Sequence, residues 1–411
     1  MARLVIYKDF LKSGRGADRA TATLANTMVQ CGYEVHVITQ QKATEPLSVT
    51  FDPAITCHAL PMRKRPIARL LNKWLLSSAV GEQLLARLFP SLDLVRQHSL
   101  ALQRLVREIQ PDVVVVAGSN ECVDLLLAGP VPMPVVMMFH VYPPECFRKN
   151  KYRRASRLKA VLPWVSECQV LLPSHRETLG MYTTAPVTAI GNGINWPVDE
   201  PLPAFASREK QIVYVAYFTK DKNHLQLLQA FAQLQAPEWT LELYGSGSPE
   251  WETRLRSAAA ELGIADRVHF MGVTHLPKPI LLRSGICAFP SKVEGFGLAL
   301  AEAMWCGLPC VGFKDAPGVS ELLSHEANGL LVEPTVEAVA AALQRLIEDA
   351  GLREQLGSIA AKTARRTFSQ ATNVQQWDDL FQRQLQKSHT QNPLQAAEET
   401  VKTVDSTPSN P

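Results

Sequence analysis

Two glutamates with seven residues between them stand in the segment whose chemistry is easiest to interpret, Pro-Ser-Lys-Val-Glu-Gly-Phe-Gly-Leu-Ala-Leu-Ala-Glu at residues 290–302. The apolar run Ile286–Phe289 before it predicts a buried strand, and Leu298–Cys306 predicts a helix. We expect Glu294 on the turn and Glu302 on the helix. The helix N-terminus favours a phosphate, and carboxylates accept hydrogen bonds from sugar hydroxyls. This combination predicts a nucleotide-sugar site.

The segment resembles the E-x7-E signature of retaining GT-B glycosyltransferases of the glycosyltransferase family 4 (group 1) type. The resemblance covers residues 1 to about 385 and is strengthened by Pro-Ser before the motif and Glu-Gly-Phe-Gly within it. It implies an α/β fold of two Rossmann-like parallel-sheet domains that face a central cleft. It also implies retention at the anomeric carbon and no essential metal ion or other cofactor. The alternative is an ordinary strand, turn and helix with solvated glutamates.

The resemblance assigns roles to the residues of this motif. Glu302 would hold the ribose hydroxyls. Glu294 and the backbone amides from Phe296 through Gly297 to Leu298 would hold the sugar and the phosphate. These two carboxylates differ from the pair of a glycoside hydrolase, which flanks the scissile bond from opposite sides.

A lysine in the second half of the chain matches the family's phosphate-binding position. Lys222 lies in a segment that resembles the family's Gly-Arg-x4-Lys loop, although Ala216 and Tyr217 replace the glycine and the arginine. A fixed cation stabilises the negative charge that develops on a leaving diphosphate. Because Tyr217 replaces the family arginine, another cation would have to meet the charge of the second phosphate; Lys220 and Arg15 are the candidates. The alternative for Lys222 is a surface lysine without a role.

The loop Ser13–Ala17 is rich in glycine and stands between a predicted strand and a predicted helix. In the family, amides of this loop, here around Gly16, face the donor pyrophosphate; a tight turn without a ligand is the alternative. A dinucleotide fold would need a third glycine where Arg19 stands and an acid after the second strand, which ends at Thr39 without one. NAD binding is therefore disfavoured.

Three more residues are candidates by resemblance. His140 follows the apolar run Val135–Phe139 and matches a family histidine that contacts the transferred sugar, although a structural cap is the alternative. Gly245 matches a turn near the nucleotide. Gly272 matches a segment whose backbone meets the base.

Composition indicates a globular enzyme rather than a fibrous or membrane protein. The 411 residues suffice for two domains, and 46% of them are hydrophobic and 20% charged. No apolar run approaches the length of a membrane span, and no secretion signal is expected at the N-terminus. Eight scattered cysteines and ten histidines form no recognisable ligand spacing, so we expect reduced thiols and no structural metal.

Apolar strands alternate with amphipathic helices along the chain, which predicts parallel α/β sheets. We expect an N-terminal Rossmann-like acceptor-side domain at 1–192, a donor domain at 193–369 and a terminal helix at 370–387. By resemblance, that helix crosses back to the first domain. The polar segment 388–411 is expected to be disordered. The predicted strands are Arg3–Tyr7, Glu34–Thr39, Val113–Ala117, Val135–Phe139, Ile212–Ala216, Leu241–Tyr244, Val268–Phe270, Ile286–Phe289 and Cys310–Gly312.

The net charge of +3 conceals two basic segments in the first half of the chain. One runs from Met62 to Leu76 and the other from Arg148 to Lys159; both lack acidic residues. They are either solvated helix faces or surfaces that meet an anionic lipid or a phosphorylated glycan. Nucleic acid is a poorer candidate because no recognition module is visible. The residues assigned to the acceptor or membrane side are Arg15, Arg63, Lys64, Arg65, Arg153 and Arg154.

Together these features predict a cytoplasmic glycosyltransferase, peripheral at the inner face of the membrane if the basic segments bind lipid. The expected donor is a nucleoside-diphosphate sugar, and UDP-hexose is the choice because UDP is the family's commonest carrier. The expected acceptor is a glycan or lipid-linked saccharide in the synthesis of envelope polysaccharide or lipopolysaccharide. The alternatives are a sugar-nucleotide epimerase, a phosphorylase on the same fold, and a catalytically silent sugar-nucleotide-binding protein.

Overall fold

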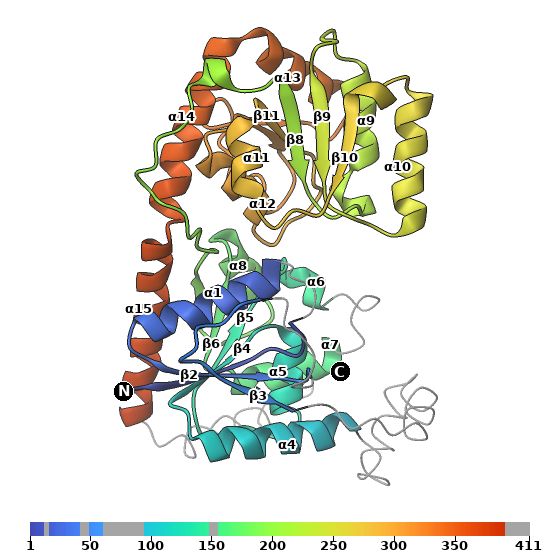
Figure 1. The fold of residues 1–411 in the computed structure, drawn as a ribbon. Helices are drawn as coiled ribbons and strands as arrows, with labels where there is room; N and C mark the ends of the chain where they lie inside the picture. The colour runs from blue at the N-terminus through green and yellow to red at the C-terminus, as the bar shows by residue number, and fades with distance from the viewer. Residues whose placement is uncertain (12–15, 42–48, 61–93, 148–154, 391–411) are drawn as a thin grey trace. The chain divides into compact units, whose positions relative to one another are not determined.

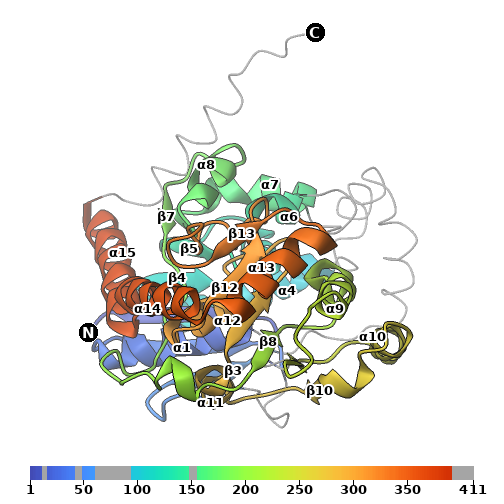
Figure 2. The same cartoon turned by 90° about the horizontal axis from the view of Figure 1, so that it is seen from above.

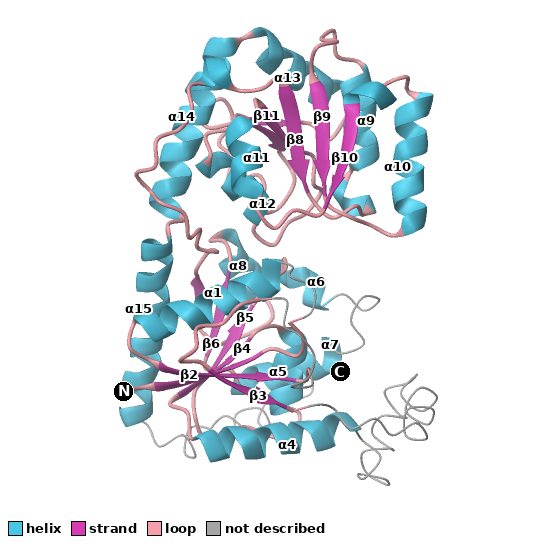
Figure 3. Ribbon diagram, viewed as in Figure 1, coloured by secondary structure: helices cyan, strands magenta, loops and turns pink. Residues whose placement is uncertain are grey.

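The computed structural model of the chain describes residues 1–11, 16–41, 49–60, 94–147 and 155–390 (Figure 1). Two compact units divide the chain. The first consists of Met1–Ile190 together with the chain from Val374 onward, and the second consists of Gly191–Asn373. Each unit is built on its own parallel sheet, as the strands in Figure 3 show.

The sheet of the first unit has seven parallel strands in the order β3-β2-β1-β4-β5-β6-β7. Its central strands β4 and β5 are apolar throughout and fully buried, as is typical of a parallel sheet with both faces covered. In β4, Val113 and Val115 belong to one hydrophobic cluster, whereas Val114 and Val116 belong to the other. The strands are β1 (Arg3–Tyr7), β2 (Glu34–Thr39), β3 (Thr56–Ala59), β4 (Val113–Val116), β5 (Val135–Met138), β6 (Glu167–Val170) and β7 (Val187–Ala189).

The helices of the first unit come from both ends of the chain. Trp377, Leu380 and Phe381 of the last helix pack into the same cluster as Leu4 and Ile6 of β1. The helices are α1 (Gly16–Gln30), α4 (Leu94–Ile109), α5 (Ser119–Leu126), α6 (Pro143–Phe147), α7 (Ala155–Val161), the 3-10 turn η2 (Leu162–Trp164), α8 (Ser174–Gly180) and α15 (Gln370–Thr390), whose residues from Val374 onward belong here.

The sheet of the second unit has six parallel strands in the order β10-β9-β8-β11-β12-β13. They are β8 (Gln211–Val215), β9 (Thr240–Tyr244), β10 (Val268–Gly272), β11 (Ile286–Phe289), β12 (Cys310–Phe313) and β13 (Leu330–Val332). Figure 2 shows α13 (Val336–Glu348) against β12 and β13. The other helices are α9 (His224–Ala232), α10 (Pro249–Glu261), α11 (Pro277–Arg283), α12 (Leu298–Trp305) and α14 (Ala350–Thr367), with 3-10 turns η3 (Phe205–Ser207), η4 (Lys220–Lys222) and η5 (Ala265–Arg267).

Both sheets reverse their strand order at one point. In the first unit the order runs outward in opposite directions from β1 and β4, and in the second from β8 and β11. The loops that leave the carboxyl ends of two such strands diverge, and ligands of open α/β sheets bind in the crevice between them. The fold therefore points to the loops after β1 and β4 and after β8 and β11.

The observed elements confirm the α/β class with parallel sheets. The sequence analysis omitted strands β3, β6, β7 and β13. The terminal helix was predicted at 370–387, whereas α15 runs from Gln370 to Thr390. Residues 391–411 lie outside the described ranges. No helix within those ranges is both long enough and apolar enough to cross a membrane.

Candidate active site

Lys222 and Glu294 form an ion pair at the switch point of the second sheet. The loop after β8 carries Lys222, and the loop after β11 carries Ser291 and Glu294. The Lys222 Nζ atom lies 2.5 Å from Glu294 Oε1 and 3.2 Å from Ser291 Oγ. The Lys222 and Glu294 side chains remain 20% and 15% exposed, so a ligand can still reach both. The structure thus brings together two residues that the sequence analysis placed in the same site.

The main chain around Lys222 is fixed by contacts from two neighbouring strands. Tyr214, on β8, donates its hydroxyl hydrogen bond to the Lys222 carbonyl at 3.0 Å. The Lys292 amide, after β11, donates to the Asp221 carbonyl at 2.9 Å. Asn223, the next residue, adopts the left-handed conformation with φ of 54° and ends the η4 turn. These contacts fix the position of the main chain from which the Lys222 side chain extends.

His224 follows this turn and is fully buried between aromatic rings. Its ring centroid lies 4.8 Å from those of both Tyr214 and Phe218. Neither ring nitrogen has a hydrogen-bond partner among the described residues. Burial, together with the nearby charge of Lys222, lowers the pKa of His224 to about 3. His224 is therefore a neutral packing residue beneath the loop.

Glycines let the neighbouring loops approach this segment closely. Gly245, directly after β9, has a φ of 148°, and a Cβ atom there would lie 2.0 Å from the Ala216 carbonyl oxygen. Its amide donates to the Gly272 carbonyl at 2.8 Å. Gly272 has a φ of 75°, and a Cβ atom placed there would meet no atom within 4 Å. Both predicted glycines lie at the carboxyl edge of the sheet, where Gly245 packs against the loop after β8 and Gly272 accepts the hydrogen bond of Gly245.

The turn before α12 presents Glu294 and the amino end of the helix. Gly297 caps α12 with a φ of 84°, and the Phe296 ring is buried, with its edge against Phe368. The Glu294 amide donates to the Pro317 carbonyl at 2.9 Å. A Cβ atom on Gly318 would lie 2.6 Å from the Glu294 carbonyl oxygen, so only glycine fits beside this turn.

Glu302 occupies the second turn of α12 and is only 3% exposed. A buried carboxylate needs hydrogen-bond donors to offset its loss of hydration. The Leu298 backbone, at the first position of α12, lies on the same helix one turn earlier. The helix thus carries the predicted ribose-binding carboxylate and the predicted phosphate-binding amides together.

Two predicted site residues belong to the first unit. Gly16 opens α1 and is exposed, with no atom within 4 Å of a Cβ placed there. His140 follows β5, and its buried Nε2 atom has no hydrogen-bond partner among the described residues. Burial and the charge of Lys8 lower the pKa of His140 to about 4, so its ring is neutral at physiological pH.

Other predicted positions are exposed or lie outside the described residues. Tyr217, in the place of the family arginine, is 45% exposed, and Lys220 is exposed as well. Within the described ranges, no group of three or more His, Cys, Asp or Glu residues could hold a metal ion. The acceptor-side or membrane-side residues Arg15, Arg63, Lys64, Arg65, Arg153 and Arg154 all lie outside the described ranges.

Three residues of this cluster were missed by the sequence analysis. Ser291 was quoted only as part of the motif, although a serine directly after a buried strand is a usable signal. Gly318 was not assigned to the site, and Tyr214 was included only as part of the predicted strand Ile212–Ala216. Nothing in the sequence distinguishes the Tyr214 hydroxyl as the partner of the Lys222 carbonyl, because that contact depends on the path of a loop.

Comparison with known proteins places this cluster in a recognised segment. Residues 200–363 match the family model described as Glycosyl transferases group 1. This segment is less than half of the chain, and it contains Lys222, Ser291, Glu294 and Glu302.

Curated relatives are similar over parts of the chain. N-acetyl-alpha-D-glucosaminyl L-malate synthase of Bacillus anthracis is 32% identical over 175 residues, which are 42% of this chain and 45% of that protein. The exopolysaccharide phosphotransferase of Streptomyces coelicolor is 29% identical over 68% of this chain and 29% of its own length. The chain thus spans less than half the length of these two relatives. The lipopolysaccharide core biosynthesis glycosyltransferase LpsD of Rhizobium meliloti is 26% identical over 59% of this chain and 80% of that protein.

Solved structures resemble the chain over almost its whole length. Sucrose-phosphate synthase of Thermosynechococcus elongatus has a TM-score of 0.72 at 19% identity and covers 93% of this chain and 99% of its own. HepE of Anabaena in complex with UDP and glucose has a TM-score of 0.71 at 20% identity, with 92% and 99% covered. The protein therefore has an α/β fold of the GT-B type with two Rossmann-like parallel-sheet units, and residues 200–363 resemble group 1 glycosyl transferases in sequence.

Proposed function

We propose that this protein is a glycosyltransferase that takes a hexose from a UDP-sugar and transfers it to a glycan or lipid-linked saccharide. The observation that carries the proposal is the Lys222–Glu294 pair at the switch point of the second sheet. It combines a cation for a diphosphate with a carboxylate for sugar hydroxyls, within a segment that matches the group 1 family model.

Lys222 is the residue proposed to stabilise the leaving diphosphate. An ammonium group has three hydrogen-bond donors, and two of them are directed to Ser291 and Glu294. The third can donate to a phosphate oxygen without loss of the other two. Charge that develops on that oxygen in the transition state is stabilised by a cation that is already in place.

Glu294 and Glu302 are proposed to hold different parts of the donor. Glu294, on the turn, would accept hydrogen bonds from the transferred sugar, while the amides at the start of α12 meet the phosphate. Glu302 would accept hydrogen bonds from the ribose hydroxyls, as a carboxylate can. His140, from the first unit, is proposed to contact the sugar as a neutral imidazole.

Names of relatives support the substrate classes. HepE was solved with UDP and with UDP-glucose. The name of LpsD refers to lipopolysaccharide core biosynthesis. The name of a Campylobacter jejuni N-acetylgalactosaminyltransferase refers to a diphospho-undecaprenol saccharide as its acceptor. Retention at the anomeric carbon is part of the proposal because the E-x7-E segment resembles that of retaining enzymes.

A thermal-shift comparison tests donor binding. We expect UDP-glucose or another UDP-hexose to raise the melting temperature more than GDP-mannose or ADP-glucose, because a ligand of the folded state stabilises it by mass action. Lys222→Gln should reduce this shift. Lys210→Gln should retain it, since Lys210 is an exposed lysine of the same unit that pairs with Glu238. If no nucleotide sugar raises the melting temperature, the donor site is refuted.

Transfer and its stereochemistry need a second experiment. The proton NMR coupling of the product's anomeric proton, with an α-linked donor, should show an α linkage if configuration is retained. Tyr217 in place of the family arginine keeps one competing function open, a silent sugar-nucleotide-binding protein. UDP-sugar binding without transfer to any of a panel of saccharides and polyprenyl-linked saccharides would favour that alternative.

A further inference from the structure

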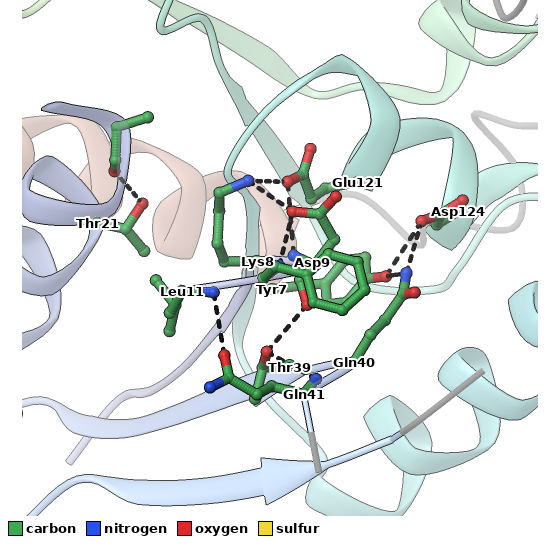
Figure 4. Close-up of polar contacts among 12 residues, drawn as sticks. Tyr7, Lys8, Asp9, Leu11, Thr21, Thr39, Gln40, Gln41, Glu121 and Asp124 are labelled. Atoms are coloured by element: carbon green, nitrogen blue, oxygen red, sulfur yellow. Dashed lines mark hydrogen bonds and ion pairs between the residues drawn. The ribbon is translucent and has the colours of Figure 1, made fainter. Parts of the chain in front are cut away.

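A second lysine–carboxylate cluster lies in the first unit, at the carboxyl ends of β1 and β4. Lys8 and Asp9 directly follow β1, and Glu121 lies in the first turn of α5, which follows β4. The Lys8 ammonium pairs with Asp9 Oδ1 at 2.7 Å and also with the Glu121 carboxylate. Figure 4 shows the three side chains directed toward one another. We name Lys8, Asp9 and Glu121 the β1–β4 cluster.

The β1–β4 cluster occupies the same topological position as the donor pair. In each unit the lysine follows the first strand of the sheet and the glutamate follows the fourth strand in chain order, and these two strands flank the switch point. Lys8 and Glu121 thus correspond to Lys222 and Glu294. Switch points are where open α/β sheets bind ligands, so the first unit has charged side chains at its ligand-binding edge.

Asp9 is held rigidly and remains reachable. Its carbonyl accepts from the Gln40 amide at 2.9 Å and from the Thr39 hydroxyl at 3.0 Å, both at the end of β2 (Figure 4). The Phe10 amide donates to Asp9 Oδ1 at 2.7 Å. The Asp9 side chain is 24% exposed, whereas that of Glu121 is 4% exposed. A ligand would therefore meet Asp9 first.

Glu121 is enclosed and supports the other two residues. A Cβ atom on Gly118 would lie 2.5 Å from Glu121 Oε2, so the carboxylate occupies the space that a side chain at position 118 would need. Burial raises the pKa of Glu121, and Lys8 offsets this only in part. Burial acts in the same direction on Asp9, but the Glu121 hydrogen bond and the Lys8 charge outweigh it and lower the pKa of Asp9. Asp9 is the carboxylate that stays ionised.

The charge balance of the cluster decides which ligand it suits. Lys8 faces two carboxyl groups, Asp9 and Glu121, whereas Lys222 faces one, so the β1–β4 cluster is a poorer site for a phosphate than the Lys222–Glu294 pair. A sugar hydroxyl both donates and accepts a hydrogen bond. It can donate to the Asp9 carboxylate and accept from Lys8, whose third donor is not used by the two carboxylates.

We propose that the β1–β4 cluster binds hydroxyl groups of an uncharged sugar residue of the acceptor, with Asp9 as the residue in direct contact and Lys8 and Glu121 holding it in place. This inference rests on the proposed function and deepens it. In this proposal the β1–β4 cluster binds only the acceptor sugar. Any phosphate or lipid elsewhere on the acceptor would be bound by the basic segments of the chain.

Saturation-transfer NMR on the full chain tests the cluster without a known acceptor. The probes are the methyl α-glycosides of glucose, galactose, mannose and N-acetylglucosamine, with glucose 6-phosphate and glycerol 3-phosphate as anionic probes. We expect at least one neutral glycoside to bind wild type, and Asp9→Asn to bind it about tenfold more weakly, as expected for the loss of one hydrogen bond to a charged group. Asp9→Glu, which keeps the charge but moves the carboxylate, should recover part of the binding.

Asp112→Asn is the matched control. Asp112 precedes β4 at the opposite edge of the same sheet, where it accepts the Arg3 amide hydrogen bond at 2.7 Å, and this variant should bind the glycoside as wild type does. The UDP-sugar thermal shift of Asp9→Asn should also equal that of wild type, which separates a failure here from a failure of the donor site. The proposal is overturned if no neutral glycoside binds wild type, if the anionic probes bind better, or if Asp9→Asn binds unchanged.

Discussion

At the scale of single residues, Glu294 and Glu302 make a contrast that kinetics can resolve. Glu302 is proposed to meet the ribose, which does not react, and Glu294 the sugar that is transferred. An interaction made equally in the ground and transition states changes affinity, whereas one made at the reacting sugar changes the rate. We therefore expect Glu302→Ala to raise the KM for the donor and Glu294→Ala mainly to lower kcat. Unchanged kinetics in Glu302→Ala would refute its assignment to the donor.

Tyr214 links the strand to the position of Lys222. Its buried hydroxyl donates to the Lys222 carbonyl, and Tyr214→Phe keeps the ring packing against His224 and Phe289. The loss of one hydrogen bond should cost about 1 kcal/mol in the free energy of unfolding. We expect a larger relative loss of kcat than of donor affinity, because the Lys222 ammonium must be correctly placed in the transition state. A variant with reduced stability but wild-type kcat would limit Tyr214 to packing.

His224 gives the second unit a predictable dependence on pH. Burial lowers its pKa to about 3 in the folded protein, and the ordinary value near 6.5 applies to the unfolded chain. Below pH 6.5 the unfolded state binds a proton that the folded state does not, so stability falls as the pH falls from 6.5 toward 3. At pH 5 this amounts to about 2 kcal/mol.

Urea unfolding at pH 7 and pH 5 measures this effect. His224→Phe keeps an aromatic ring between Tyr214 and Phe218 but cannot titrate, so it should lose less stability than wild type between the two pH values. His140, whose pKa is also lowered by burial, is present in both proteins and cancels in the comparison. Equal losses in the two proteins would contradict the assignment of this term to His224.

At the scale of elements, the strands that frame the donor pair were predictable and the contacts between their loops were not. Strand β11 has the predicted bounds Ile286–Phe289, and β8 is shifted by one residue from the predicted Ile212–Ala216 to Gln211–Val215, because an apolar run between polar residues is typical of a buried parallel strand. Strand β6, by contrast, contains Glu167 and Gln169 and carries no such signal. Glu167 is nevertheless buried, and its charge is met by Arg383 of α15, more than 200 residues away. Partners this distant cannot be inferred from local pattern.

Gly245 offers a test of how one element supports another. Gly245→Ala would place a methyl group 2.0 Å from the Ala216 carbonyl oxygen, at a φ of 148°. We expect a loss of more than about 2 kcal/mol in the free energy of unfolding and a loss of donor binding, since strain and a backbone clash add. Gly263→Ala is the control: its φ is 67°, but no atom lies within 4 Å of the new Cβ, so it should cost about 1 kcal/mol and leave donor binding intact.

At the scale of the whole molecule, one arrangement is used twice. Each unit presents a lysine–glutamate pair between diverging loops, yet the sequence analysis found only the pair in the second unit. The donor motif has characteristic neighbours, Pro-Ser and Glu-Gly-Phe-Gly, whereas Lys8 and Glu121 are separated by more than 100 residues without a motif around either. Lys8 and Glu121 are brought close together because β1 pairs directly with β4 in the sheet.

The basic segments of the first half of the chain are not explained by either pair. Five basic residues lie between Arg63 and Lys73 and seven between Arg148 and Lys159, next to a Trp74-Leu75-Leu76 sequence in the first case. If they meet an anionic membrane, each contributes about 1 kcal/mol near the surface, an attraction that salt screens. A neutral acceptor sugar in the first unit would then belong to a lipid-linked molecule whose charged part lies at the membrane.

Liposome sedimentation distinguishes this arrangement from a freely soluble acceptor. Binding to vesicles that contain anionic lipid should fall as salt rises from low to physiological concentration, and fall again when Arg63, Lys64 and Arg65 are replaced by Gln. Replacing the exposed Lys210, Lys314 and Lys362 of the second unit by Gln removes the same charge elsewhere and should have a smaller effect. If both triple variants bind equally, net charge alone is responsible. If wild type ignores anionic vesicles even at low salt, the membrane hypothesis is refuted, and a soluble or phosphorylated glycan acceptor becomes the better account of the basic segments.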